Sequence, residues 1–446
     1  MQHSAGQAEQ QLWAGAAVTD LTPPGRVFLF GYPHVARFST GVHDRLESAA
    51  LFLRSGKEQA LFIANDLIFV GRELVDEVRR RISRRTGVVA GSIAVTATHT
   101  HSGPVMVDYV SNSADPVVPK ADSAYLAWVA SRLVENGCAA VGSAVPAVAG
   151  LAVARAEGIG TNRHDPAGPA DPEVPVLVVR AQADRRPLAC MVAYAMHPTV
   201  LHEDSTVISG DFPHFTRQYL RDRGLLPAGC PVLYHNGASG DQSPRHVTRA
   251  NTLAEARRLG ELLGAAIAGV IPGISCSPVL PLRARSHRVE LQVRRLPSVV
   301  EAEALARAAL VRFEDLRKGP ALRAAVRTAE CDWFGAEETV ALARAAVDGR
   351  LQAADLCSPA EIQVIGIGPS KFVLWPGEFF VDYALQVKAR SPRTFVITLA
   401  NGELQGYIVT PEAAARGGYE ADNAVFGPDN GRRMVEATLA LLAAGT

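Results

Sequence analysis

Two segments of the chain place histidines directly after apolar, strand-like runs. His99 and His101 stand in VTATHTHSGP at residues 95–104, and His197 ends the run LACMVAYAMH at residues 188–197. Imidazole nitrogen is a suitable ligand for zinc, copper or iron. Because alternate residues of a strand face the same way, we expect His99 and His101 to point into one pocket. Solvated loop histidines, or a core histidine with satisfied hydrogen bonds, are the ordinary alternatives.

Two further segments add a carboxylate and a phenol. Glu378 follows the Pro-Gly turn of VLWPGEFF at residues 373–380, at an expected helix start, and Tyr407 follows the strand-like run 394–399. Read alone, Glu378 is a helix-capping residue and Tyr407 a core aromatic. Two histidines with one carboxylate are nevertheless a common ligand set of catalytic zinc, and α/β sheets bind ligands beyond strand ends. The combination favours a metal-dependent hydrolase, since a bound metal lowers the pKa of water toward neutrality.

The elements that must position these side chains alternate between strands and helices. Strand-like runs, rich in apolar and β-branched residues, cover 49–53, 60–70, 93–97, 174–179, 188–195, 232–234, 362–367, 371–374 and 394–399. Helical patterns cover 72–86, 123–141, 248–269 and about 431–444, with two or three helices in 298–355 broken near Gly319 and Gly335. The alternating stretch 283–294 predicts an edge or hairpin strand. The sequence therefore predicts an α/β fold, a mixed sheet with flanking helices.

Composition narrows the class of protein. The 446 residues are 48% hydrophobic, and 45 basic residues balance 45 acidic ones, which argues against nucleic acid as a partner. No apolar run is long enough to cross a membrane, and no secretory signal is evident, so we expect a cytoplasmic protein. The six cysteines form no CxxC pair and are expected to be free. We expect a disordered tail at residues 1–13 and one catalytic domain at 14–446, with the Pro-rich stretch 272–281 as an internal linker.

An ordered set of motifs resembles the catalytic domain of the neutral (neutral/alkaline, non-lysosomal) ceramidase family. The resemblance runs from about Ala14 to the C-terminus, without the immunoglobulin-like C-terminal domain or signal sequence of that family. Asn-Arg-His stands where the family has Asn-Arg-Ser. The motifs are THTHSGP at 98–104, NRHDP at 162–166, AMHPT at 195–199, SGDFP at 209–213, GDQSP at 240–244, PGEF at 376–379, GYIVTPE at 406–412 and YEADNAVFGP at 419–428.

The resemblance implies a role for eight residues. Four of them would hold one zinc ion per chain: His99, His197, Glu378 and Tyr407. Four would act on the substrate: His101 by contacting it, Arg163 by lining the site, Ser243 as the serine discussed as a nucleophile, and Tyr419 beside the polar group of the substrate.

The implied reaction is hydrolysis of a linear C–N amide bond by zinc-bound water. His101 would pass a proton to the leaving amine, Tyr419 or Arg163 would donate to the oxyanion, and Asp66, Asp211 and Asp241 are candidates to orient a histidine. Three alternatives stay open: a Ser243-dependent amidase or esterase, an acyltransferase, and a non-catalytic binding protein. Because the signal sequence and Asn-Arg-Ser are both absent, we expect a soluble, small-molecule or lipid-like amide as substrate. The sequence does not identify that amide or the oligomeric state.

Overall fold

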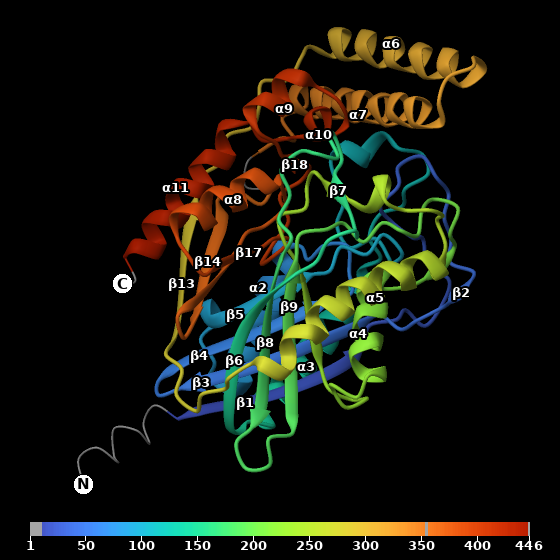
Figure 1. Cartoon of the computed structure of the whole chain (residues 1–446). Coiled ribbons are helices and arrows are strands. Elements are labelled where there is room, and N and C mark those ends of the chain that lie inside the picture. Colours follow the sequence, from blue (N-terminus) through green and yellow to red (C-terminus); the bar gives the residue numbers. More distant parts are fainter. Residues whose placement is uncertain (1–10, 353–355, 445–446) are drawn as a thin grey trace.

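An eight-stranded mixed sheet lies at the centre of the structure, a computed structural model that describes residues 11–352 and 356–444 (Figure 1). Its outer pairs, β11–β9 and β4–β5, are parallel, and the pairs between them are antiparallel. The predicted mixed sheet is therefore confirmed. In spatial order the strands are β11 (Val232–Asn236), β9 (Pro187–Tyr194), β8 (Glu173–Ala181), β6 (Val145–Arg155), β1 (Leu12–Asp20), β3 (Glu47–Ser55), β4 (Glu58–Asn65) and β5 (Ile93–Ala97).

A four-stranded sheet packs on one face of the first, and helices cover the outer faces of both. Alternation along β3 and β4 explains the layers, because successive side chains point to opposite faces. Phe52 and Ile63 pack under α2 and α3, whereas Leu51 and Phe62 pack toward the second sheet. The second sheet has the order β13 (Leu282–Val289), β14 (Ala360–Ile367), β15 (Ser370–Leu374) and β17 (Thr394–Ile397).

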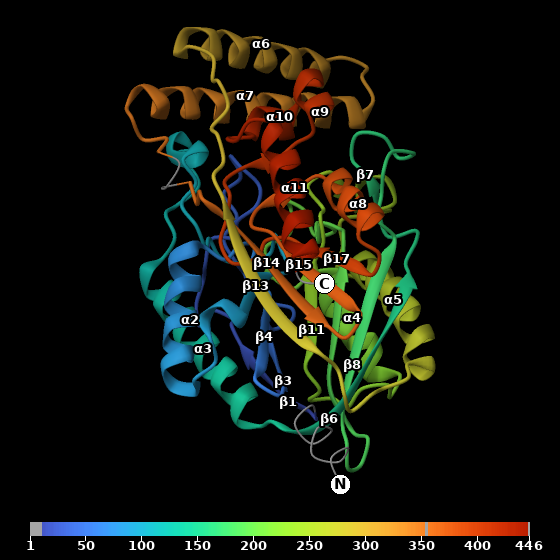
Figure 2. The same ribbon diagram turned by 90° about the vertical axis from the view of Figure 1, so that its left-hand side faces the viewer.

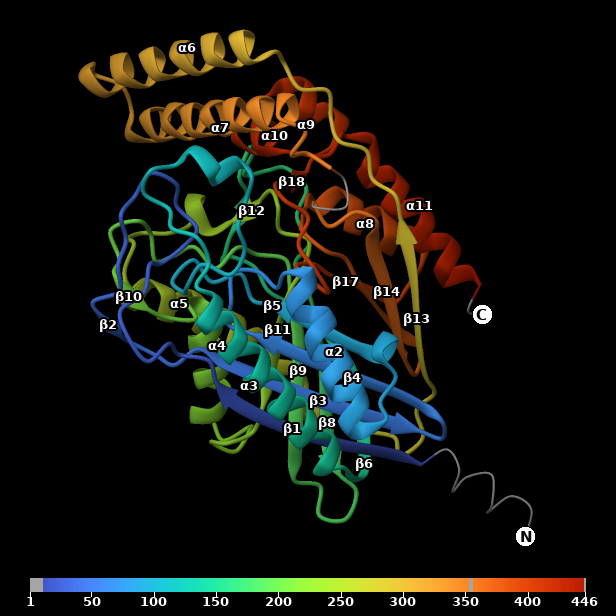
Figure 3. The ribbon, with the colours of Figure 1, turned by 180° about the vertical axis from the view of Figure 1, so that it is seen from behind.

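The helices complete a four-layer arrangement of helices, sheet, sheet and helices. The outer face of the large sheet carries α2 (Arg72–Thr86), α3 (Ser123–Gly142), α4 (Phe212–Asp222) and α5 (Leu253–Val270) (Figure 3). The small sheet carries α8 (Val381–Arg390) and α11 (Asp429–Ala443). The long α6 (Val299–Lys318) and α7 (Arg323–Val347) form a hairpin at one end of the molecule, beside the short α9 (Pro411–Arg416) and α10 (Tyr419–Asn423) (Figure 2).

Shorter elements complete the part of the chain that the structure describes. Three two-stranded pairs are β2 (Gly41–Val42) with β10 (Val207–Ile208), β7 (Thr161–Asn162) with β12 (Gln242–Ser243), and β16 (Glu378–Phe379) with β18 (Tyr407–Ile408). Four 3-10 turns are η1 (Ala90–Ser92), η2 (Ser111–Ala114), η3 (Pro244–His246) and η4 (Ile271–Gly273). In the part of the chain described, no helix is long and apolar enough to cross a membrane.

The edges of the large sheet approach each other. A twist of about 20–25° per strand accumulates to roughly 150° over eight strands, which turns the ends of β5 and β9 toward one side. Thr96 Oγ1 of β5 lies 2.8 Å from His235 Nδ1 of β11, and Thr398 N, just after β17, donates to Asn236 O at 2.8 Å. The loops that follow β5 and β9 therefore reach the same region.

All nine predicted strand runs coincide with strands, but several boundaries differ. The run 60–70 continues past the end of β4 because residues 67–70 form a buried apolar loop. Gly335 does not break a helix: it lies within α7, where a Cβ would come within 3.2 Å of Tyr419 Cα. Glu378 lies in β16 rather than at a helix start, since α8 begins at Val381.

The N-terminal segment and the proposed linker are also more ordered than expected. Residues 1–10 of the expected tail lie outside the described part of the chain, whereas Leu12 and Trp13 already belong to β1, opposite Ser55 and Arg54 of β3. The stretch 272–281 runs along β6, with two hydrogen bonds between Ser277 and Ala149. The six cysteines are free, as expected.

Candidate metal centre and active site

The His-Thr-His segment forms a loop directly after β5. β5 ends at Ala97, and His99 adopts a left-handed conformation with φ 72°. The Nε2 atoms of His99 and His101 lie 3.3 Å apart, and both residues line one cavity. The expected shared pocket is thus present, but a loop conformation produces it rather than the alternation of a strand.

Backbone carbonyl groups fix the buried imidazoles of His99 and His197 from behind. His99 Nδ1 lies 3.0 Å from Ile68 O, and His197 Nδ1 lies 2.6 Å from Ser239 O and 3.0 Å from Gln242 O. A carbonyl accepts only, so in each ring Nδ1 carries the proton and Nε2 presents a lone pair. This is the tautomer and orientation of a metal-binding histidine.

The carboxylate of Glu378 lies against these lone pairs. Its Oε2 is 3.0 Å from His197 Nε2 and 3.3 Å from His99 Nε2. Two ligands bonded tetrahedrally to one zinc ion at 2.0–2.2 Å lie about 3.3–3.5 Å from each other. The ligand nitrogens of His99, His101 and His197 also all lie within 4.8 Å of one another. The donor set and its spacing therefore fit a single metal ion.

The electrostatics of the cluster suit a bound cation. Burial would raise the pKa of Glu378, but His99 and His197 outweigh it and hold that pKa well below its usual range. Burial lowers the pKa of His197 to about 3, and burial with the two neighbouring imidazoles keeps the pKa of His101 well below its usual value. A neutral imidazole at His197 beside an ionised Glu378 is the pair of protonation states that metal binding requires.

Tyr407 reaches the centre through strand pairing. It lies opposite Glu378 in the parallel pair β16–β18, which joins two segments that are not neighbours in the sequence. Burial and the charge of Glu378 raise the pKa of Tyr407 well above its usual value, while Arg163 Nη1, 3.4 Å from the hydroxyl oxygen, acts in the opposite direction. The phenol therefore keeps its proton unless a cation lies against its oxygen.

Arg163 and Tyr419 flank Tyr407. Arg163 Nη1 forms an ion pair with Glu420 at 3.1 Å, and its guanidinium carbon lies 5.9 Å from the ring centroid of Tyr407. The ring of Tyr419 stands 6.0 Å from that of Tyr407 and lines the cavity. The structure thus brings seven of the eight predicted site residues to one place.

Ser243 is the eighth: it follows Gln242, whose carbonyl oxygen lies 3.0 Å from His197 Nδ1, but Ser243 itself does not line the cavity. It ends β12, is buried, and its Oγ accepts a hydrogen bond from Arg245 N at 3.4 Å, at the start of η3. Among the residues that the structure describes, no histidine or carboxylate forms a hydrogen bond with this hydroxyl. A serine nucleophile needs such a base.

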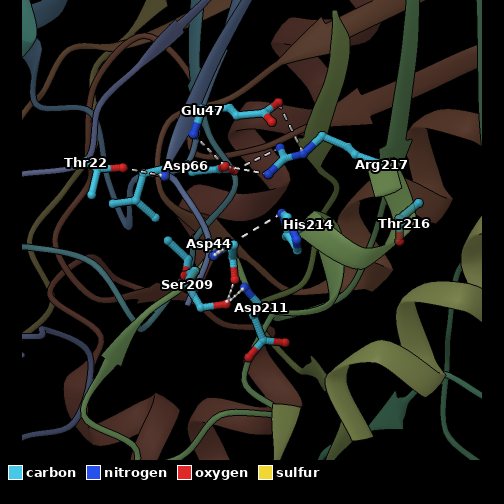
Figure 4. Close-up of polar contacts among 12 residues, drawn as sticks. Thr22, Asp44, Glu47, Asp66, Ser209, Asp211, His214, Thr216 and Arg217 are labelled. Atoms are coloured by element: carbon cyan, nitrogen blue, oxygen red, sulfur yellow. Dashed lines mark hydrogen bonds and ion pairs between the residues drawn. The ribbon is translucent and has the colours of Figure 1, made fainter. Parts of the chain in front are cut away.

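A buried polar network supports the two histidine loops from behind (Figure 4). Asp44 accepts hydrogen bonds from Ser209 Oγ at 2.6 Å and from Gly210 N at 2.8 Å. Ser209 O in turn accepts from Thr100 Oγ1 at 2.6 Å, in the loop that carries His99. Asp211 accepts from Leu201 N at 2.8 Å, in the loop after His197.

The hypothesis that Asp66, Asp211 and Asp241 orient histidines directly is wrong. Asp66 forms a bidentate ion pair with Arg217, at 3.0 and 2.5 Å (Figure 4). Asp241 accepts from Asn162 Nδ2 at 2.6 Å and from Val381 N at 2.9 Å. These carboxylates hold loops in place, while backbone carbonyls orient the imidazoles.

The cavity at the centre has a volume of about 50 Å³. Its walls include Ile68 and Phe69 from the apolar loop after β4, and Glu338 from α7. The sequence analysis missed Glu338, because one more Glu in an Ala/Arg/Glu-rich helix resembles a surface residue. It also missed the role of residues 67–70, whose apolar character was assigned to a strand.

Known structures share this architecture, although no protein-family model and no curated protein matches the chain. The neutral ceramidase from Pseudomonas aeruginosa superposes with a TM-score of 0.71, over 96% of this chain and 73% of that chain, at 17% identity. The chain has the neutral ceramidase fold. A second structure, a ceramidase complexed with C2, gives a TM-score of 0.70 at 16% identity, over 96% of this chain and 74% of that one. The ceramidase-like fold implied by the sequence resemblance is confirmed.

Proposed function

We propose that the protein is a zinc-dependent amidohydrolase that cleaves a linear amide bond. The observation that carries this proposal is the convergence of His99 Nε2, His197 Nε2 and Glu378 Oε2, at 3.0 and 3.3 Å, in a buried cavity. Tyr407 is the proposed fourth ligand. His101 is the alternative fourth ligand, because His101 Nε2 lies 3.3 Å from His99 Nε2. The amide specificity rests on the ceramidase fold and the motifs.

The residues around the cluster have separate tasks in this proposal. Zinc bound there would lower the pKa of a water molecule and polarise the amide carbonyl. The ring of His101 lines the cavity beside His99, where it would pass a proton to the leaving amine. Tyr419 donates its hydroxyl proton to the developing oxyanion. Arg163 stays charged, because Tyr407 and Glu420 raise its pKa despite burial.

The cavity favours a small substrate over a long-chain lipid. Its volume of about 50 Å³ is too small for a long acyl chain, and polar side chains such as Asn112, Glu338 and Asn423 contribute to its walls. We therefore propose a soluble amide with polar substituents rather than membrane ceramide.

Removal of the metal tests the proposed function. Treatment with a strong chelator is expected to abolish hydrolysis of N-acyl amides, and stoichiometric zinc is expected to restore it, because the ion held by His99, His197 and Glu378 would supply the attacking water. Far-UV circular dichroism controls for unfolding. Undiminished turnover by protein with no detectable metal would contradict the proposal.

Replacement of Ser243 separates the zinc mechanism from a serine nucleophile. Ser243→Ala is expected to keep kcat within about threefold of wild type, whereas loss of a true serine nucleophile costs about a million-fold. The reason is that no base contacts the hydroxyl in the described structure. A burst of acyl-enzyme seen with wild type and lost in Ser243→Ala would reverse this assignment.

A further inference from the structure

Glu338 is a buried carboxyl group in the cavity wall without a compensating partner. It lies on α7, is only 5% exposed, and lines the same cavity as His99 and Glu378. Its Oε2 has no hydrogen-bond donor within reach among the residues that the structure describes. An unpaired buried carboxyl is costly, so a position like this needs a reason.

The charges that act most strongly on Glu338 are all negative. They belong to Asp115, Glu378, Glu337 and Asp422. Burial and these charges raise the pKa of Glu338 to about 8. Among the described residues, no basic side chain forms an ion pair with Glu338 itself, so a cationic group of a ligand is the partner that its carboxyl group lacks.

A second unpartnered acceptor lines the same cavity. Asn423, at the end of α10, is 6% exposed, and its Oδ1 has no donor among the described residues. Helix α10 packs against α7, so Asn423 and Glu338 come from adjoining elements. Two acceptors in one wall match a group that donates several hydrogen bonds, and an ammonium donates three.

The helix that carries Glu338 is fixed to the rim of the cavity. His34 Nε2 pairs with Glu337 at 2.9 Å, and the His34 ring stacks on Trp333 at 5.6 Å. Arg327 pairs with Glu203, in the loop after His197, through two contacts of 2.9 and 3.1 Å. Glu338 is therefore held in place before any ligand enters, which limits the entropy cost of binding.

We propose that Glu338 and Asn423 form a subsite for an ammonium group carried by the substrate, which makes the substrate an N-acylated diamine or a similar amide with a free amine. This inference rests on the proposed function, since it takes an amide bound at the zinc centre as the reacting group. The ammonium supplies the cationic partner that Glu338 lacks, and the amide remains free to reach the cluster of imidazoles.

Matched substrates test the subsite in the zinc-supplied enzyme. Monoacetylputrescine and N-pentylacetamide have the same length, but one ends in an ammonium and the other in a methyl group. Wild type is expected to favour the ammonium substrate in kcat/KM by about 10-fold or more, the range of a charge-assisted hydrogen bond. Glu338→Gln is expected to reduce this ratio to near one, while Glu314→Gln, the same substitution on exposed α6, retains it.

A binding measurement distinguishes failure of the subsite from failure of the proposed function. Calorimetry with the same zinc-supplied proteins is expected to give about 10-fold weaker binding of monoacetylputrescine to Glu338→Gln than to wild type. If no amide is hydrolysed but this difference is present, the subsite stands and the proposed function fails. If amides are hydrolysed but the ratio is near one in wild type, or unchanged in Glu338→Gln, the subsite is refuted. Equal calorimetric affinities refute it as well.

Discussion

Glu378→Gln is expected to lose tightly bound zinc and to lower kcat/KM for amide hydrolysis by about a thousand-fold or more, equivalent to several kcal/mol of lost charge stabilisation. Glutamine has nearly the same shape, so the substitution removes a charge and little volume. That charge lies 3.0 Å from His197 Nε2 and 3.3 Å from His99 Nε2. Zinc content after gel filtration and initial rates on an N-acyl amide measure the two effects.

Glu403→Gln is the matched control for this experiment. Glu403 is also buried, and its Oε1 accepts a hydrogen bond from Tyr109 at 2.5 Å. Burial, aided by the charge of Glu378, raises the pKa of Glu403 well above its usual value, which favours its neutral form, so the change removes less negative charge than Glu378→Gln does. Equal zinc loss in both variants would mean that the Glu378 effect is not specific to the metal centre.

Arg217→Met is expected to destabilise the fold by about 3–5 kcal/mol, the cost of leaving one partner of a buried ion pair unpaired. Arg217 and Asp66 are nearly inaccessible and form two contacts, at 3.0 and 2.5 Å (Figure 4). Arg217 also lies 3.7 Å from Glu47, whose pKa falls to about 2 because Arg217 and Arg221 outweigh the effect of burial. Urea denaturation at fixed zinc concentration measures the loss.

Two comparisons identify the unpaired charge as the cause. Arg221→Met, at the more exposed end of the network, is expected to cost less than half as much, and Asp66→Leu combined with Arg217→Met is expected to recover most of the loss. Burial already raises the pKa of Asp66. In Arg217→Met the folded state therefore favours a proton that the unfolded state releases, and the penalty grows as the pH rises above the ordinary aspartate pKa of about 3.9. A pH-independent penalty that the double variant does not relieve would contradict this explanation.

The sequence predicts the large regular elements because their local patterns are strong. The helix 72–86 and the strand 93–97 are found with the predicted bounds. β1 has no strong local signal because LWAGAAVTD contains few β-branched residues, and pairing with β3 and β6 makes it a strand. Gly15 in β1 allows close packing on α3, where a Cβ would lie 2.2 Å from Ala140 O. Such tertiary contacts have no local signature.

The candidate site also contains residues that have a local signal in the sequence and residues that have none. His99, His197 and Glu378 follow apolar runs and combine residue types that bind metals, so the residues alone suggest them. Tyr407 depends on the pairing of β18 with β16, a non-local contact, and only the resemblance indicated it. Glu338 can be recognised as a site residue only from the structure, in which α7 places it in the cavity wall. Its burial beside the cavity, and not its residue type, distinguishes it from the other Glu residues of the helix.

Diffraction data collected on both sides of the zinc absorption edge, from crystals of protein supplied with zinc, test the central claim most directly. The account predicts one anomalous peak per chain, about 2.0–2.2 Å from His99 Nε2, His197 Nε2 and a carboxylate oxygen of Glu378. The fourth protein contact in that map distinguishes Tyr407 from His101. Full occupancy of zinc at another position, with no peak among these three residues, would contradict the account.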